Sequence, residues 1–274
     1  MGTGLAAALA LAVLGGAQAQ ATTTLDETIR VVGKGQFKTL KTGPGEPFTV
    51  REAGLGHAKR NRAKKRRSIT YFSQLTDPQI ADEMSPLRVE LIDPAGGEVS
   101  AAWRPQEAMG TQVLDQIIRS VNANRRSPVK QGKGRGRAKL GFALLTGDQP
   151  DNQQYNEIEW HLGVMDGSEI TPFSGTPVTT SSCGGLTQQQ VDTFNADVAN
   201  RSYTGVQDYS DYPGLPASRY QGFWDPDEPA GAGDYAAFPQ YPGLMDRAQQ
   251  PFKAKGLKVP WYITKGNHDG LIQG

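Results

Sequence analysis

Residues 259–264 (VPWYIT) form a short apolar run, and residues 265–270 (KGNHDG) follow it directly. The run predicts a short hydrophobic strand, and the glycines on either side of the Asn-His pair predict a sharply turned loop at its end. In such a loop Asn267 can offer an amide oxygen to a metal ion while the imidazole of His268 faces a substrate. This layout suits metal-assisted hydrolysis of a phosphoester.

Two further stretches have the same layout, an apolar run that leads into a loop with carboxylates. Residues 69–75 (ITYFSQL) predict a buried strand that ends before Asp77 and Gln79. Residues 140–145 (LGFALL) predict another strand, followed by Asp148 and Asp151.

Two predicted helices, each marked by apolar residues at helical spacing, separate these strands. One helix is predicted over residues 107–124, and a second is marked by Tyr155, Ile158, Leu162 and Met165. Alternating strands and helices predict an α/β fold, a sheet with helical crossovers whose chemistry lies at the carboxyl ends of the strands.

Composition bounds the class of protein. A chain of 274 residues can bury one large core, and 33 Gly with 18 Pro indicate a loop-rich protein rather than a helical bundle. A mean hydropathy of -0.52 excludes a multi-span membrane protein. The net charge of +1 does not by itself indicate a polyanionic partner. The single Cys183 excludes an intrachain disulfide, and we interpret it as a passive thiol.

The first residues predict a targeting segment. The apolar run at 5–14 is too short for a stable anchor, and residues 17–19 (AQA) fit a small-x-small cleavage rule. We therefore expect a signal peptide over residues 1–19, no transmembrane anchor, and a secreted or cell-envelope location. An ordinary Ala-rich helix is the alternative.

Residues 20–67 predict an N-terminal extension that ends in a basic run. The cations of this basic run are Lys59, Arg60, Arg62, Lys64, Lys65, Arg66 and Arg67. No aromatic residue lies among them for base stacking, so we interpret the run as a solvated face and expect no nucleic-acid partner; an anionic surface is the alternative. A second basic stretch, 125–139, is predicted to be a flexible loop between a helix and a strand.

A long insertion is expected at about residues 167–256. Val191, Phe194 and Val198 predict a helix within it, and an aromatic-rich stretch follows. Two interpretations stand side by side for the insertion, a wall or lid beside the active site and a self-packed surface excursion.

The three motifs, in this order, resemble those of the calcineurin-like metallophosphoesterase superfamily. Its pattern is Asp-x-His, Gly-Asp-x-x-Asp, Gly-Asn-His-Asp/Glu, a lone His and a C-terminal Gly-His-x-His. Residues 74–77, 82–90 and 151–157 look more narrowly like a secreted actinobacterial branch. The resemblance covers residues 68–274 and implies a β-sandwich flanked by helices, of which only the N-terminal part is present. The three downstream His ligands are missing, since the chain holds only His57, His161 and His268.

The resemblance also implies a site with two divalent metal ions. Asp77 and Gln79 would bind the first ion, Asp148 would bridge the two, and Asn267 would bind the second. His268 would protonate the leaving oxygen, with Asp151 orienting its imidazole through a hydrogen bond.

Gln79 stands where the family has His, and an amide oxygen favours Mn or Mg over Zn, with Fe also open. His161 has no ligand partner at metal-binding spacing and is expected to be a helix-surface or packed residue.

The expected activity is hydrolysis of phosphoesters, as a phosphatase or phosphodiesterase, with this chain alone inactive. The alternative is a non-catalytic secreted binding or surface protein on the same scaffold. Substrate identity and oligomeric state are left open.

Overall fold

The computed structural model describes residues 23–33, 39–47, 60–85, 105–203 and 241–270. The helices are α1 (Arg62–Lys65), α2 (Gly110–Ala123), α3 (Tyr155–Asp166), α4 (Gln188–Asn200) and α5 (Leu244–Ala248), with 3-10 turns η4 (Pro105–Met109), η5 (Ser182–Gly184) and η8 (His268–Gly270). The strands are β1 (Glu27–Val32), β2 (Thr39–Pro44), β3 (Ser73–Leu75), β4 (Arg126–Lys130), β5 (Arg137–Lys139), β6 (Ala143–Leu145), β7 (Glu169–Ile170), β8 (Phe252–Lys253) and β9 (Trp261–Ile263). The predicted signal peptide lies outside the described residues, as does most of the aromatic-rich stretch.

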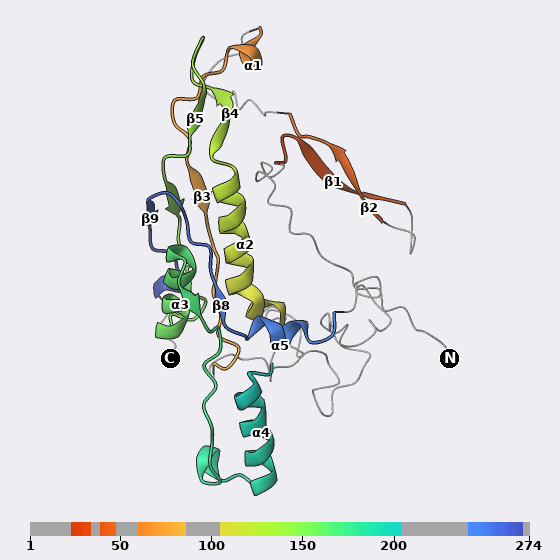
Figure 1. Cartoon of the computed structure of the whole chain (residues 1–274), viewed down its shortest axis with the longest axis vertical. Helices are drawn as coiled ribbons and strands as arrows, with labels where there is room; N and C mark the ends of the chain where they lie inside the picture. Colours follow the sequence, from red (N-terminus) through yellow and green to blue (C-terminus); the bar gives the residue numbers. More distant parts are fainter. Residues whose placement is uncertain (1–22, 34–38, 48–59, 86–104, 204–240, 271–274) are drawn as a thin grey trace, which may run out of the picture.

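The described part is a mixed α/β structure with small sheets and a few helices (Figure 1). Its central sheet has three parallel strands in the order β3-β6-β9, with Leu75 opposite Leu145 and Leu145 opposite Ile263. Helix α2 lies between β3 and β6 in the chain, and α3 between β6 and β9, as expected of helical crossovers. All three strands therefore end at the same edge of the sheet.

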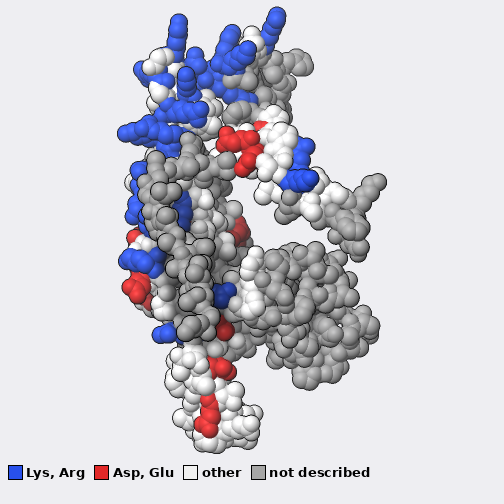
Figure 2. All heavy atoms as spheres, turned by 45° about the vertical axis from the view of Figure 1, so that its right-hand side comes forward, with Lys and Arg blue, Asp and Glu red and all other residues white. Residues whose placement is uncertain are grey.

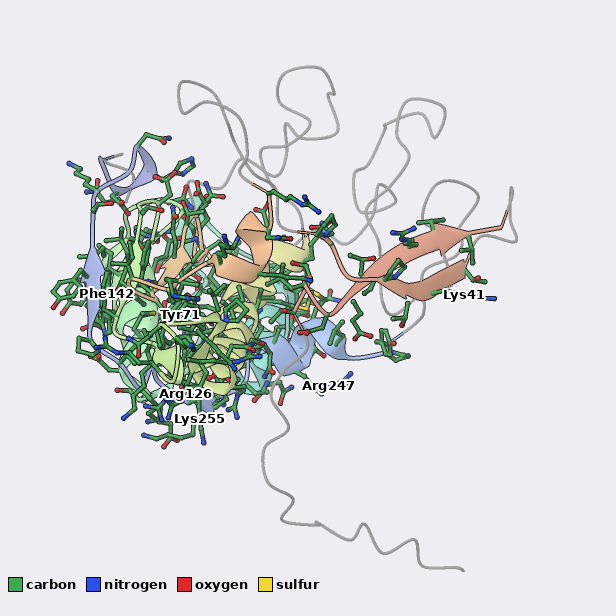
Figure 3. All side chains as sticks on the ribbon, turned by 90° about the horizontal axis from the view of Figure 1, so that it is seen from above. Lys41, Tyr71, Arg126, Phe142, Arg247 and Lys255 are labelled. Carbon is green, nitrogen blue, oxygen red and sulfur yellow. The ribbon has the colours of Figure 1, made fainter. Side chains whose placement is uncertain are left out.

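Three two-stranded antiparallel sheets accompany the central one. They pair β1 with β2, β4 with β5, and β7 with β8. From above, the β1–β2 hairpin with Lys41 projects away from the body that carries Tyr71, Phe142 and Arg126 (Figure 3).

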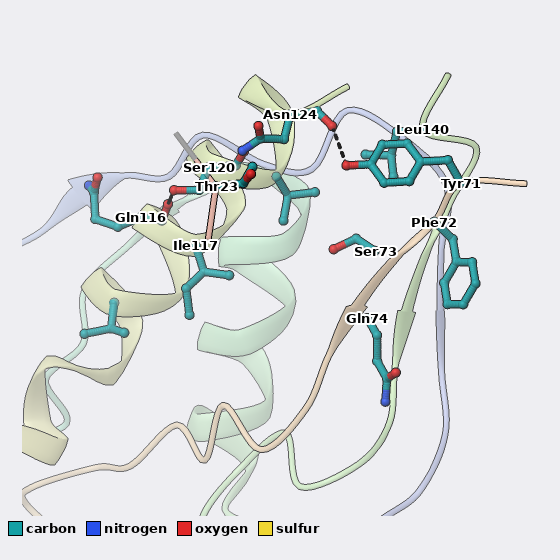
Figure 4. Close-up of a pocket in the computed structure, with 12 residues that line it drawn as sticks. Thr23, Tyr71, Phe72, Ser73, Gln74, Gln116, Ile117, Ser120, Asn124 and Leu140 are labelled. Atoms are coloured by element: carbon teal, nitrogen blue, oxygen red, sulfur yellow. Dashed lines mark hydrogen bonds between the residues drawn. The ribbon is translucent and has the colours of Figure 1, made fainter. Parts of the chain in front are cut away.

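The main core packs α2 and α3 against β6. Its fully buried apolar members include Ile118, Leu145, Val164 and Met165, each at most 1% exposed. Helix α2 presents Leu114 and Ile118 to this core, as its apolar spacing predicts, but Val113 and Ile117 remain exposed. A hollow of about 570 Å³ lies beside these exposed residues, between α2 and β3 (Figure 4).

Two predicted strands are shorter in the structure. Residues 69–75 and 140–145 pair only over β3 and β6, because the parallel ladder joins three residue pairs. The expectation that 69–75 is buried is wrong, since Ile69 is 95% exposed and Phe72 is also exposed.

The second basic stretch is not a loop. Residues 126–130 and 137–139 form the antiparallel hairpin β4–β5. Ser127 is buried between the exposed Arg126 and Pro128, and Ala138 between the exposed Arg137 and Lys139, which is the period-two alternation of a half-buried strand. The predicted flexible loop is therefore corrected to a hairpin.

The helix predictions hold for position but not everywhere for orientation. Helix α3 forms where predicted, yet Tyr155 and Leu162 are exposed while Glu157 and His161 are buried. Helix α4 forms within the predicted insertion, with Val191 and Val198 buried. In the part of the chain that the structure describes, no helix has the length and apolar character needed to cross a membrane.

Candidate active site

Loops from all three parallel strands meet at the carboxyl edge of the sheet. After β3, the backbone N–H of Asp77 donates to the carbonyl of Gly147 at 3.1 Å, and that of Gln79 donates to the carbonyl of Asp148 at 3.0 Å. After β9, the N–H of Thr264 donates to the carbonyl of Leu145 at 2.8 Å. The end of β6 and the loop after it are thus held by backbone hydrogen bonds, to the chain after β9 and to the chain after β3 respectively.

Close contact between the β6 and β9 loops depends on two glycines. Gly147 has φ +110°, and a Cβ there would lie 2.7 Å from the Cα of Gly266. A Cβ on Gly266 would overlap the carboxylate of Asp148. Both motif glycines are therefore required by the approach of the two loops.

Asp269 ties the same two loops together. Its carboxylate accepts hydrogen bonds from the backbone N–H groups of Asp148 at 2.9 Å, Gln149 at 2.8 Å and Gly266 at 2.6 Å. Asp269 is not among the predicted site residues. The available signal was its place directly after the Asn-His pair, but two of its three partners, Asp148 and Gln149, lie more than a hundred residues away in the sequence.

Three of the predicted metal ligands have left-handed backbone conformations. The φ angles are 53° for Asp77, 41° for Gln79 and 56° for Asp148. Residues other than glycine rarely adopt positive φ, and such strain persists only where surrounding contacts enforce it. Here the backbone hydrogen bonds between the loops supply those contacts.

The predicted ligands are brought to one edge but not to one cavity. Asp77 and Gln79 line a cavity of about 470 Å³ together with Asp151. Asp148 is 7% exposed and does not line that cavity; its Oδ1 accepts from the backbone N–H of His268 at 2.8 Å. Asn267, the neighbour of His268, is exposed.

The predicted metal ligands are all oxygen donors. Among the described residues, no group of three or more His, Cys, Asp or Glu side chains gathers closely enough to hold a metal ion. The predicted set has two carboxylates, Asp77 and Asp148, and two amides, Gln79 and Asn267. Such oxygen donors suit hard cations such as Mg and Mn.

His268 lies against Asp151, the other predicted catalytic residue. Its Nδ1 is 2.8 Å from the backbone carbonyl of Asp151 and 3.5 Å from the Asp151 carboxylate oxygen Oδ1. A carbonyl oxygen can only accept a hydrogen bond, so Nδ1 carries the proton. The Nε2 atom of His268 is then the one that can exchange a proton with a substrate.

Glu157 of α3 supports the chain segments that follow β3 and β6. It is fully buried, and its carboxylate accepts from the backbone N–H of Asp82 at 3.0 Å and of Asn152 at 2.8 Å. Burial raises the pKa of Glu157, and these backbone hydrogen bonds act in the opposite direction.

His161 is packed, one of the two placements expected for it. It is 1% exposed, and burial lowers its pKa to about 4, while the charge of Asp269 acts to raise it. The imidazole is therefore neutral near neutral pH. With the buried Gln149, it lines a second cavity of about 490 Å³.

In comparisons with known proteins, no family model, no curated protein and no solved structure matches this chain.

Proposed function

We propose that the chain carries a site for two-metal-dependent hydrolysis of phosphoesters at the loops that follow β3, β6 and β9. The supporting observation is that these loops are hydrogen-bonded to one another and hold Asp77, Gln79 and Asp148 in left-handed conformations. Strain of this kind concentrates at functional sites. The proposal includes a β-sandwich of the metallophosphoesterase type as the complete architecture.

The proposed ligand set is the one that the sequence indicates. Asp77 and Gln79 would hold one divalent ion, Asn267 the other, and Asp148 would bridge them, with Mn or Mg favoured by the oxygen donors. When bound, two such ions would neutralise charge on the phosphoryl oxygens and lower the pKa of an attacking water. The carboxylate of Asp148 has one oxygen engaged by the His268 N–H, which fixes its orientation for binding through the other.

The protein's own contribution would be to position substrate and move a proton. With both ring nitrogens protonated, His268 would deliver the proton on Nε2 to the leaving oxygen and keep the one on Nδ1, which the Asp151 carbonyl holds. The cavity lined by Asp77, Gln79 and Asp151 would receive the phosphoester.

One observation favours a second candidate, a binding protein without catalysis on the same scaffold. No group of three or more His, Cys, Asp or Glu that could hold a metal ion is found among the described residues. A scaffold of this kind would keep the loop contacts but bind no divalent ion.

Metal titration tests the proposal directly. Free Mn²⁺ would be followed by electron paramagnetic resonance in the wild-type chain, in Asp148→Asn and in Asp192→Asn. The amide in Asp148→Asn still accepts from His268 but loses the charge, so we expect at least a roughly tenfold loss of affinity. Asp192 lies exposed on α4, so its variant should bind as the wild type does. Equal binding by all three proteins, or none by the wild type, would remove the metal site.

Turnover separates the two candidates. An aryl phosphate and its diester would be assayed with Mn, Mg or Zn added. Metal-dependent hydrolysis that disappears in His268→Asn supports the hydrolase, whereas a protein that neither binds a divalent ion nor turns over either substrate fits the binding protein.

A further inference from the structure

The fold joins the two basic stretches into one surface. The described cations of this surface, here called the basic end, are Arg60, Lys64, Lys65, Arg66, Arg67, Arg125, Arg126, Lys130, Lys133, Arg135, Arg137 and Lys139. The N–H of Ser68 donates to the carbonyl of Lys130 at 3.0 Å, which fastens the segment after α1 to β4. Figure 1 shows α1 and the β4–β5 hairpin at the same end of the molecule, and Figure 2 shows Lys and Arg gathered there.

The two segments of the basic end do not balance their own charge, although the carboxylate of Asp26 interacts with Arg137. Residues 60–67 and 125–139 contain no Asp or Glu. In the hairpin, Arg126 pairs with Lys139 and Lys130 pairs with Arg137, so cations face each other across the two strands. Directly opposed like charges destabilise a hairpin, and an anion bound over them would relieve the repulsion.

An exposed apolar side chain lies beside these cations. Ile69 is 95% exposed, two residues after Arg67 and next to Ser68, whose backbone is bonded to β4. Surfaces that attach to anionic bilayers combine Lys and Arg for the headgroups with apolar side chains that enter the interface. Nucleic-acid surfaces that hold single strands add aromatic rings for base stacking, and neither basic segment contains one.

We propose that the basic end, with Ile69 at its margin, docks the protein onto an anionic lipid bilayer. The attraction is local, because the whole chain has a net charge of only +1. Helix α4, at the other end of the molecule, carries Asp192 and Asp197 and no Lys or Arg, so an anionic surface would orient the molecule as well as attract it (Figure 2).

Vesicle sedimentation of the full chain tests the proposal. Phosphatidylcholine vesicles with and without phosphatidylglycerol would be compared, at low and at physiological salt. The test variant is Lys130→Gln/Lys133→Gln/Lys139→Gln, and the matched control is Lys253→Gln/Lys255→Gln/Lys258→Gln. Each removes three charges from lysines that are exposed in the structure.

We expect binding only to vesicles that contain phosphatidylglycerol. The test variant should lose roughly 100-fold in apparent affinity, from three lysines near a charged surface, and the control should change by less than about threefold. Thermal unfolding by circular dichroism would check that both variants fold. Equal binding to neutral vesicles, or an equal loss in the control, would overturn the proposal.

Ile69→Asn separates a bilayer from a nucleic acid. The exposed side chain makes no core contact, so the substitution should leave the fold intact while weakening vesicle binding. Duplex DNA would be titrated in parallel. If duplex DNA binds more tightly than the anionic vesicles and Ile69→Asn leaves vesicle binding unchanged, the basic end is a phosphate-backbone surface and the bilayer proposal fails.

Discussion

Gly266 is the position at which a single methyl group would disturb the candidate site most. Its ideal Cβ overlaps the Asp148 carboxylate, so Gly266→Ala must push the β9 loop away from the β6 loop. We expect a loss of roughly 1–3 kcal/mol in the free energy of unfolding, measured by urea denaturation, because overpacking costs about that much. Gly136→Ala is the control, since its added Cβ would meet nothing within 4 Å. Similar losses in both variants would contradict the close approach of the loops.

Asp269 offers a second test at the scale of one residue. Asp269→Asn replaces an acceptor carboxylate by an amide with only one acceptor oxygen, while three backbone N–H groups point at it. We expect the amides of Asp148, Gln149 and Gly266 to exchange hydrogen faster, with a destabilisation of about 1–3 kcal/mol. Exchange measured by NMR would show this, and unchanged protection of these three amides would refute it.

Among the helices, α3 supports the candidate site through the hydrogen bonds that Glu157 accepts. Glu157→Gln would turn an amide NH₂ toward one of the two backbone donors, Asp82 or Asn152, so we expect the free energy of unfolding, measured by chemical denaturation, to fall by roughly 1–3 kcal/mol. Glu159→Gln is the same change on the exposed face of the same helix and should stay within about 0.5 kcal/mol. Equal stabilities of the two variants would disprove this supporting role of Glu157.

The elements also show where sequence patterns suffice. The position of α2 was predictable because Leu114 and Ile118 repeat at helical spacing and meet the core. The inward face of α3 was not, because its buried residues include the polar Glu157 and His161, which hydrophobic periodicity ignores. The β4–β5 hairpin was missed because only the small Ser127 and Ala138 mark its buried side.

For the candidate site, local signals located the strand ends but not the contacts between them. Asp77, Asp148 and His268 follow apolar runs, so the sequence indicates that they lie in loops at one edge of a sheet. Which oxygen meets which donor depends on long-range pairing. The 2.8 Å contact of His268 with the Asp151 carbonyl, shorter than that with the carboxylate, is invisible in the motif because every residue has a carbonyl.

For the whole molecule, His161 predicts how stability depends on pH. Its pKa is about 4 in the folded protein and about 6.5 when unfolded, so the unfolded chain takes up the proton first as the pH falls. As the pH is lowered from about 6.5 to about 4, the free energy of unfolding should therefore fall, and His161 alone should account for roughly 3 kcal/mol of that loss. Urea denaturation across this range would measure it, and His161→Gln should flatten the dependence. An unchanged slope in the variant would assign the effect to other groups.

The parallel direction of the central strands sets the two ends of the molecule apart. Residues 125–139 lead into the amino end of β6, whereas Asp148 and its neighbours follow its carboxyl end. A protein held on a bilayer by its basic end would thus present the candidate site toward the surrounding solution. Its substrates would arrive by diffusion in three dimensions rather than along the lipid plane. In a form of the protein with hydrolase activity, binding to vesicles should then leave the rate on a water-soluble phosphoester unchanged and the lipid headgroups intact.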